Sequence, residues 1–527
     1  MTAGMISPGV VGAQSEYHYL AQSQPKGNWV VSAFRWDLSQ RAWRLTEEDG
    51  QRLIWQSYTE NDASDRTFTH PMLVAGDDLW SDYTIRVRFA PQSDRFQSGI
   101  VFRYHTSRTY YFAGVVGQHA VLKKVDNGCA FRKLAESILA EKACSWKPGE
   151  FLTLEVTAMG DRLTATFGQD VRLEACDGAF KHGKIGYTAD VPTKYAAVCV
   201  TCSDEAQTAF EKALAARVAE EARLEAENPQ LVLWKKIATP GFGTGRCLRF
   251  GDLDGDGRID ILVVQQNPHG PKDKLQPLWH LTLNTGHYPY AYDVNGDGKD
   301  ELMVGYSLVN HDGKIIWSLE KQLGNDHADG VAIVSFKEGS APRLQCVASD
   351  DGFFTADLQG HILEHLQLGH MQNPTIARFR PDLPGLQTVT VNFWGNQGIV
   401  NFFDADGKKY HDFEPAPHGS MMRPLNWKGD GQEYWILSPN PTYGGVYDGW
   451  GRRVMRFPAD GHPDMCVATL ALTGDCRDEI VVWDPWEIWI YTQSDNPKPG
   501  RLYKPRRNPL FNDSNYQTNV SLPGWSN

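Results

Sequence analysis

Two short acidic loops carry the clearest chemistry in this sequence. Oxygen-bearing side chains recur at alternate positions in GDLDGDGRID and again in DVNGDGKDEL, and the candidate ligands are Asp252, Asp254, Asp256 and Asp260 in the first loop and Asp293, Asn295, Asp297 and Glu301 in the second. Hard divalent cations take about six to eight oxygen ligands, and glycines between the acids let the carboxylates converge. We expect each loop to hold a structural calcium ion.

Two alternatives to calcium follow from the same residues. An EF-hand requires flanking helices, whereas both loops lead into the β-type sequences ILVV and LMVG, so that fold is excluded. An Asp-Gly turn that only accepts hydrogen bonds from its own backbone amides is the simpler alternative. A weaker copy at residues 426–433 favours this alternative, because Lys428 occupies a ligand position there.

A basic or imidazole side chain recurs near the start of each repeat in the second half. The series is Arg246, His287, His327, His370, His418 and His462. If every inner strand runs toward its acidic loop, these residues meet around an axis at the opposite face. We expect two or three imidazoles to face a pocket, as general base or acid or as metal ligands. The alternative is that each residue hydrogen-bonds the backbone of the neighbouring repeat.

Further side chains in the second half suit an anionic sugar. The cations and the phenol are Arg423, Arg452, Arg453 and Tyr443. Exposed indoles stack on pyranose rings, and the candidates in or beside the loops are Trp394, Trp427 and Trp450.

The elements that must position these residues are short strands in a repeated unit. Phe250-GDLDGDGRIDILVV and Tyr292-DVNGDGKDELMVG are near copies, with weaker versions downstream. A repeat of about 40 to 48 residues built from short strands is typical of β-propeller blades. Residues 230–527 therefore predict a propeller of about seven blades, six of them recognisable. VLWKKIA and the C-terminal tail together would form the seventh.

The first half predicts an all-β domain of a different kind. Residues 1–28 form an N-terminal extension, and residues 29–203 read as a β-sandwich because Tyr83, Ile85, Val87 and Phe89 alternate with polar residues. A hairpin turn is expected at 160–161. The stretch SGIVFRYHTSRTYYFAGV resembles concanavalin-like or laminin-G jelly-roll modules.

The segment 204–229 joins the two halves and changes period. Its apolar residues Phe210, Leu214, Val218 and Ala222 lie four apart behind a Ser203/Asp204 start, which predicts a linker helix that packs one face on a domain. A coiled-coil dimer is the less favoured alternative, because the stripe is mostly alanine. We expect a monomer.

The composition limits which classes of partner and which compartments are expected. The 527 residues carry a net charge of -12, and the acids are spread along the chain, which argues against nucleic acid. Of the nine cysteines, Cys199 and Cys202 have a CxxC spacing but lack a second such pair, and the set implies no oxidising compartment. We expect no membrane insertion and, from the sequence as written, a cytoplasmic protein; a trimmed signal peptide would instead imply a secreted or periplasmic one.

The acidic loops, HADG, ARFRPDLPG and the tail NPLFNDSNYQTNVSLPG resemble the propeller of rhamnogalacturonan lyases and related rhamnose-uronate lyases. The resemblance implies β-elimination at a rhamnose-uronic acid linkage, structural calcium and a uronic-acid-containing oligosaccharide or polysaccharide as partner. A cation would neutralise the carboxylate, and Arg246, Arg423 or Arg452 are candidates; the imidazoles from His287 to His418 and Tyr443 are candidates for base and acid. The alternatives are a non-catalytic carbohydrate- or protein-binding protein and a propeller glycoside hydrolase that releases rhamnose.

Overall fold

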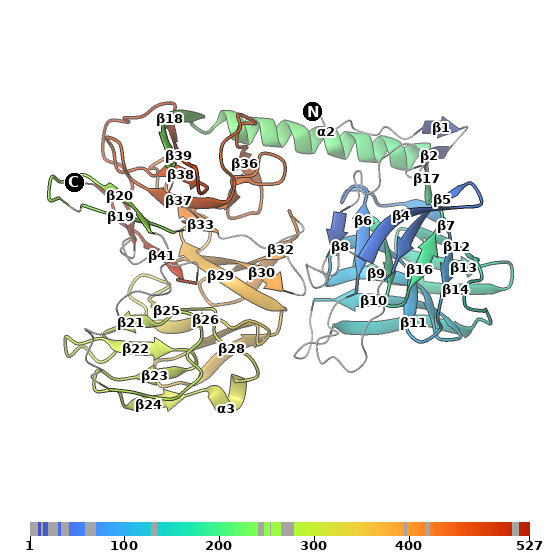
Figure 1. The fold of residues 1–527 in the computed structure, drawn as a ribbon, viewed down its shortest axis with the longest axis horizontal. Helices are drawn as coiled ribbons and strands as arrows, with labels where there is room; N and C mark the ends of the chain where they lie inside the picture. The colour runs from blue at the N-terminus through green and yellow to red at the C-terminus, as the bar shows by residue number, and fades with distance from the viewer. Residues whose placement is uncertain are drawn as a thin grey trace. The chain divides into compact units, whose positions relative to one another are not determined.

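The computed structural model describes residues 9–11, 14–18, 30–32, 42–57, 70–127, 134–240, 247–252, 254–264, 279–394, 398–416, 422–507 and 516–526. Its chain forms two compact units, Met1–Ala219 with Trp394–Gln397, and Glu220–Phe393 with Gly398–Asn527. Both are built almost entirely of antiparallel strands (Figure 1). The expectation of an all-β chain is confirmed for these residues.

The first unit contains two large sheets. The ten-stranded sheet comprises β1 (Gly9–Val11), β2 (Gln14–His18), β17 (Cys199–Ser203), β7 (Tyr83–Pro91), β12 (Leu152–Met159), β13 (Arg162–Phe167) and β14 (Val171–Cys176), with β16 (Thr193–Tyr195), β5 (Gln51–Gln56) and β4 (Trp43–Glu48) attached. The seven-stranded sheet has the order β11 (Ala135–Ala143), β10 (His119–Asp126), β9 (Thr109–Val116), β8 (Gln97–Thr106), β15 (Lys184–Ala189), β6 (Met72–Ala75) and β3 (Val30–Ser32).

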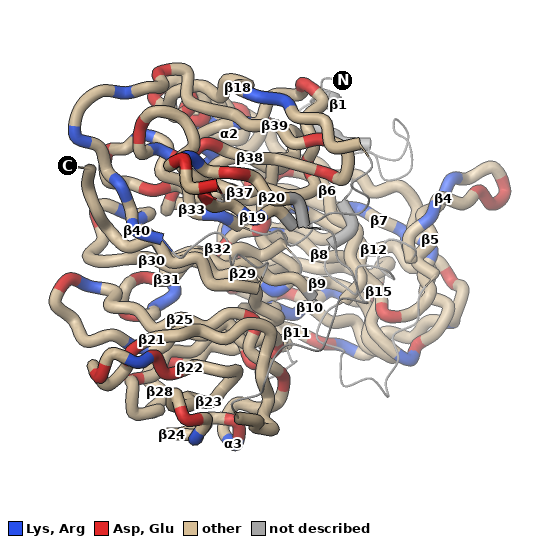
Figure 2. Tube along the Cα trace, turned by 60° about the vertical axis from the view of Figure 1, so that its left-hand side comes forward, with Lys and Arg blue, Asp and Glu red and all other residues tan. Residues whose placement is uncertain are grey.

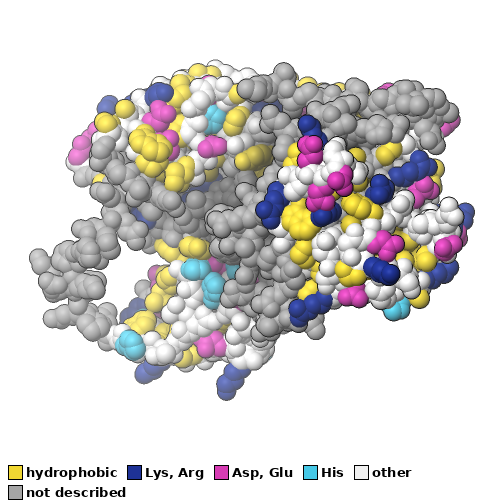
Figure 3. Space-filling view, turned by 45° about the vertical axis from the view of Figure 1, so that its right-hand side comes forward, with side chains coloured by type: hydrophobic (Ala, Val, Ile, Leu, Met, Phe, Trp, Pro, Cys, Tyr) yellow, Lys and Arg dark blue, Asp and Glu magenta, His cyan; other side chains and the backbone are white. Residues whose placement is uncertain are grey.

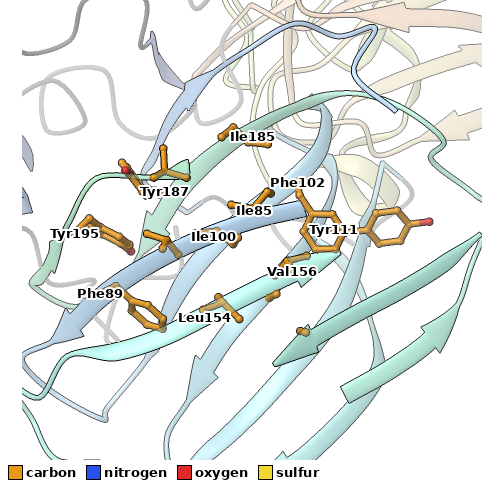
Figure 4. Close-up of a cluster of buried hydrophobic side chains, with 14 of the residues drawn as sticks. Ile85, Phe89, Ile100, Phe102, Tyr111, Leu154, Val156, Ile185, Tyr187 and Tyr195 are labelled. Carbon is orange, nitrogen blue, oxygen red and sulfur yellow. The ribbon is translucent and has the colours of Figure 1, made fainter. Parts of the chain in front are cut away.

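The core of this unit draws side chains from both sheets. Ile85 of β7 and Val156 of β12 are buried with Ile100 and Phe102 of β8 (Figure 4). The predicted alternation along β7 is confirmed, since its apolar positions are buried and Arg86 and Arg88 are exposed. Burying each such side chain contributes about 1.5 to 3 kcal/mol.

The predicted hairpin turn is also confirmed. Met159 pairs with Arg162 across residues 160–161. Gly160 has a φ of 54°, a left-handed conformation that glycine adopts without strain.

The predicted helix is present as α2 (Asp204–Ala226), with Ser203 Oγ accepting a hydrogen bond from the Ala206 amide at 3.2 Å. The boundary between the two units falls within α2. The expected apolar face is wrong, because Val218 is 51% exposed and the buried residue is Leu224. Alanines bury too little apolar area to define a packed stripe. None of the described helices is long and apolar enough to cross a membrane.

The second unit contains a succession of small antiparallel sheets. They comprise β19 (Cys247–Gly251) and β20 (Asp260–Val264); β21 (Tyr290–Tyr292), β22 (Glu301–Val304), β23 (Ser307–Val309) and β24 (Ile315–Ser318); β25 (Gly330–Val334), β26 (Arg343–Val347), β27 (Phe353–Ala356) and β28 (Ile362–Leu366); β29 (His370–Ala377), β30 (Gln387–Trp394), β31 (Val400–Phe403) and β32 (Lys409–Phe413); β33 (Arg423–Leu425), β34 (Tyr434–Ser438), β35 (Gly445–Tyr447) and β36 (Arg453–Met455); and β37 (Cys466–Leu470), β38 (Glu479–Trp483) and β39 (Glu487–Gln493). A short helix, α3 (Glu320–Leu323), follows β24.

The two ends of this unit join different sheets. Strand β18 (Leu231–Ala238) pairs with β39, whereas β41 (Asn519–Leu522) pairs in parallel with β29 and β40 (Arg506–Arg507) pairs with β41. The expectation that VLWKKIA and the tail together form one further sheet is therefore wrong. The edge strands β39 and β29 each have backbone groups free to pair with a further strand, and β18 pairs with the first whereas β41 pairs with the second.

Positions of Lys and Arg and of Asp and Glu are interspersed along the described strands and loops (Figure 2). This agrees with the interspersed charges of the sequence.

Candidate functional site

Three of the predicted histidines come together in the second unit. His287 precedes β21, His327 precedes β25, and His370 is the first residue of β29. The rings of His287 and His327 lie 4.7 Å apart, and those of His327 and His370 lie 6.3 Å apart. His287 and His327 are 39% and 34% exposed, whereas His370 is 10% exposed, and histidine side chains are visible on the surface of this unit (Figure 3).

Two imidazoles and one carboxylate converge on a single point. His287 Nε2 lies 3.0 Å from His327 Nε2, and Asp329 Oδ1 lies 3.4 Å from the first nitrogen and 3.8 Å from the second. Asp329 is fully buried, and its Oδ1 has no hydrogen-bond partner among the described residues. A buried carboxylate oxygen without a donor is costly unless a cation or a proton compensates it.

A second carboxylate orients His327. Asp326 Oδ1 lies 2.6 Å from Nδ1 of the ring, which places a proton on this nitrogen and turns Nε2 toward His287 and Asp329. Ser349, whose φ is 49°, lies 3.2 Å from His327 Nε2 through its hydroxyl, which also donates to Asp329 Oδ2. A carboxylate on the outer nitrogen is the usual support of a metal-bound histidine.

His370 is fixed within the same cluster. Its Nδ1 lies 2.8 Å from Asp350 Oδ1, and its Nε2 accepts a hydrogen bond from Gln372 Nε2 at 3.1 Å. Asp326, Asp350 and His370 form a second group whose ligand atoms lie within 4.8 Å of one another. With both nitrogens engaged, His370 is better placed to hold its neighbours than to exchange a proton with a substrate.

Burial and charge act in opposite directions on the ionisable groups. The hydrogen bond with Asp326 raises the pKa of His327, while burial lowers the pKa of His287 despite nearby Asp329. Burial also raises the pKa of Asp329, although the histidines oppose this. A carboxyl group and imidazoles with altered pKa values at an exposed site are typical of functional centres.

Close backbone packing places these side chains. Gly286 has a φ of 62°, and a Cβ there would lie 2.4 Å from the Ala328 carbonyl oxygen. The His287 amide donates to this same oxygen at 2.9 Å. Glycine at 286 therefore allows the segment before β21 to reach the HADG segment before β25.

Sequence reasoning missed Tyr516. Its ring stacks on His287 with centroids 4.0 Å apart and an interplanar angle of 19°. Burial, and then the negative charge of Asp329, raise the pKa of the phenol. No local motif marks this tyrosine. Its only signal was its place in the tail segment that carried the family resemblance.

The two acidic loops have nearly the same geometry. Asp252 Oδ1 and Asp293 Oδ1 each accept a hydrogen bond from the amide three residues ahead at 2.7 Å, and their Oδ2 atoms accept from the amide five residues ahead at 2.9 Å. Ligand atoms of Asp252, Asp254 and Asp260 lie within 4.8 Å of one another. Either a turn alone or a calcium site fits these hydrogen bonds.

The second loop gains a neighbour that its sequence did not indicate. His311, from the turn between β23 and β24, brings a ligand atom within 4.8 Å of those of Asp297 and Glu301. Glu301 accepts a hydrogen bond from the Val294 amide at 3.0 Å, which holds the carboxylate over the loop. The third loop differs, since Glu433 binds Arg507 at 2.7 Å and Lys428 binds Asp430 at 3.2 Å.

Several proposed site residues lie outside the described part of the chain. These are Arg246, His418 and the side chain of Trp394. Their roles stay predictions.

The predicted arginines that the structure describes are engaged with protein groups. Arg423 is buried and donates to Asn519 Oδ1 at 3.2 Å. Arg452 binds Asp448 at 2.8 Å and Glu220 at 3.1 Å, and Arg453 lies 3.6 Å from Glu221. A substrate carboxylate would have to compete with these ion pairs.

The remaining candidates have contacts of their own. His462 is buried and contacts Asp460 and the Pro439 carbonyl, both at 2.7 Å, and Tyr443 packs partly buried near Asp464. Trp427 is fully buried and donates to the Pro229 carbonyl at 2.7 Å, so neither face is open to a sugar. Trp450 has the guanidinium groups of Arg380 and Arg452 within 4.8 Å of its ring.

Comparisons with known proteins give only distant similarities. No family model and no curated protein matches the chain. The solved rhamnogalacturonan lyase YesW is 14% identical over 98% of this chain and 81% of its own, with a TM-score of 0.33. A Bacillus licheniformis rhamnogalacturonan lyase is 13% identical over 90% of this chain and 74% of its own, with a TM-score of 0.32.

A third similarity concerns part of the chain. The carbohydrate-binding module CBM66 of Bacillus subtilis is 16% identical over 32% of this chain and 93% of its own, with a TM-score of 0.25. At these scores the three matches establish neither the fold nor the activity of this chain.

Proposed function

We propose that the second unit is a lyase that cleaves rhamnose-uronic acid linkages by cation-assisted β-elimination. The observation that carries the proposal is the convergence of His287 Nε2, His327 Nε2 and the unsatisfied Asp329 Oδ1. β-Elimination requires a positive charge at the uronate carboxylate, because this charge acidifies the adjacent C–H bond. A cation held by these three atoms at an exposed position would supply it.

The spacing of the three atoms fits a divalent transition-metal ion. With metal–ligand distances of about 2.1 Å, separations of 3.0 to 3.8 Å correspond to angles of about 90° to 130°. Imidazole ligands favour zinc, iron, nickel and similar ions over calcium. When bound, the ion would act as a Lewis acid toward the carboxylate.

Other roles in the reaction belong to side chains of the protein. Asp326 fixes the tautomer of His327, and buried Asp329 supplies negative charge that retains the cation. The C5 proton and the leaving oxygen require a base and an acid, for which the imidazoles and phenols named above remain the candidates. Asp326, Asp329 and Asp350 each contact a histidine, which favours elimination over a hydrolase with two carboxylates available for acid and base.

The proposal includes the architecture that holds the site. Inner strands of successive sheets contact one another from β21 through β25, β29 and β33 to β37, and β18 joins the last sheet. This succession supports a propeller, with calcium in the loops that begin at Asp252 and Asp293. The two packed sheets of the first unit support a jelly-roll sandwich.

Ultraviolet absorbance of 4,5-unsaturated uronate tests the proposal. The protein is mixed with rhamnogalacturonan, gum arabic and ulvan oligosaccharides, with manganese or zinc and with calcium. We expect absorbance to rise with wild type and to fall by about 100-fold or more with His287→Ala or His327→Ala. His361→Ala is the matched control, because His361 is an exposed histidine in a hairpin turn.

Other products would favour the alternatives. New reducing ends without absorbance would indicate a hydrolase, and saccharide binding without any product would indicate a binding protein. Equal turnover by His327→Ala and wild type would refute the role of the triad.

A further inference from the structure

We infer that Tyr516 is a positioning residue of the cation site, held there by the C-terminal segment through a buried arginine. The inference rests on the proposed function and extends it to a part of the chain far from His287 in sequence.

The stacking of Tyr516 on His287 is the basis of the proposed positioning role. The Tyr516 ring lies against the His287 imidazole at 4.0 Å and nearly parallel to it. His287 is 39% exposed and precedes a strand of three residues, so its local backbone constrains the ring weakly. Torsions that end in a planar ring have broad energy wells, and rotation of the imidazole would move Nε2 away from His327 and Asp329. A stacked ring restricts that rotation.

Strand β41 brings Tyr516 to the correct end of the unit. It runs parallel to β29, with Asn519 opposite Thr375 and Val520 opposite Ile376. Residue 516 therefore lies toward the start of β29, where His370 is located. On the other side, a Cβ added to Gly330 would lie 3.1 Å from Thr518 Oγ1, so the segment also passes the start of β25, next to Asp329.

A buried arginine anchors this segment. Arg507 on β40 pairs with Ser521 of β41, and its guanidinium binds Glu433 at 2.7 Å and Asp478 at 2.8 Å. Ser521 Oγ donates to Glu433 at 2.6 Å. Glu433 is fully buried and Asp478 nearly so. Such charge-assisted hydrogen bonds have strict geometry, so they hold β41, which pairs with β29, at the residues that precede β34 and β38.

Cobalt binding to the full-length protein tests the inference, with calcium saturating so that the acidic loops are filled. The variants are Tyr516→Leu, which removes the stacked ring, and Tyr516→Phe, which keeps it. We expect Tyr516→Leu to weaken Co²⁺ binding and kcat/KM by about 10-fold or more, as for other residues that orient a ligand. Tyr516→Phe should stay close to wild type, and the Co²⁺ absorption spectrum should change only in the leucine variant.

Trp525→Leu is the matched control, because Trp525 is an aromatic residue of the same tail that packs on Tyr503. It should bind Co²⁺ as wild type does. Arg507→Met should also weaken Co²⁺ binding. If the Arg507→Met protein does not fold, the Tyr516 variants alone test the inference, because Tyr516 is only half-buried and its substitution should leave the fold intact.

The outcomes separate the two proposals. Wild-type affinity and spectrum in Tyr516→Leu, with binding abolished in His287→Ala, would overturn the positioning role and leave the cation site intact. Equal Co²⁺ binding by wild type and His287→Ala would overturn the cation site and this inference with it.

Discussion

Calcium should stabilise the second unit through two separate loops. A ligand that binds only the folded state stabilises it by about 2.7 kcal/mol when its concentration is 100 times Kd. Two such loops, at Asp252 and Asp293, would contribute about 5 kcal/mol at that concentration. For a unit of this size we expect chelation by EDTA to lower Tm by about 10 °C.

Substitutions in one loop should remove half of this increment. In Asp293→Asn the first oxygen can still accept from the Gly296 amide, while the charge and the bond from Gly298 to Oδ2 are lost. The loss of that bond changes stability by about 1 kcal/mol even without calcium. The informative quantity is therefore the difference between Tm with and without calcium, measured by calorimetry, which should fall to about 5 °C.

Asp404→Asn is the matched control. Asp404 Oδ1 accepts hydrogen bonds from the Asp406 and Lys408 amides, both at 2.9 Å, in a hairpin turn of similar shape. We expect its calcium increment to equal that of wild type. If Asp252→Asn and Asp293→Asn also retain the full increment, the loops are turns that hold their own amides and the calcium assignment is wrong.

Two further predictions concern the first unit. Burial lowers the pKa of His70, but contacts with Asp190 and Glu136 outweigh it and raise the pKa to about 9. Protonated His70 therefore stabilises the fold, by at most about 3 kcal/mol. This contribution is fully present below the unfolded pKa of 6.5 and is lost as the pH rises through 9. Denaturant midpoints of wild type should fall over this window, whereas those of His70→Gln should change less; parallel curves would contradict the assignment. Leu154 is fully buried, and Leu154→Ala should cost about 2 to 5 kcal/mol in urea unfolding of that unit, while Ile138→Ala, at a position 62% exposed, should cost far less; equal losses would place Leu154 outside the core.

Local patterns specified the parts of the fold that depend on neighbouring residues. The alternation of β7, the turn at 160–161 and the capped start of α2 follow from side-chain period and turn chemistry, which act over a few residues. The predicted apolar face of α2 was wrong because four-residue spacing shows which side chains share a face of the helix, but does not show whether another element packs on that face. Helix packing is decided by the partner surface.

The repeats also located part of the candidate site. His287, His327 and His370 could be aligned because each stands at the start of a repeat, and the structure brings these three together. The aromatic candidates could not be sorted in the same way. Trp427 and Trp450 were both expected in or beside loops, yet one is fully buried and the other has two guanidinium groups within 4.8 Å of its ring.

The sequence by itself determined the acidic loops, the short-strand repeats and the imidazoles that begin them, because each is encoded within a few consecutive residues. Only the tertiary structure decided that Asp329 supplies the third converging atom, that Asp326 orients His327 and that Tyr516 covers His287. These contacts depend on how inner strands and the C-terminal tail lie beside one another. Distances between such segments are set by packing and strand pairing across the whole unit, which no local pattern encodes.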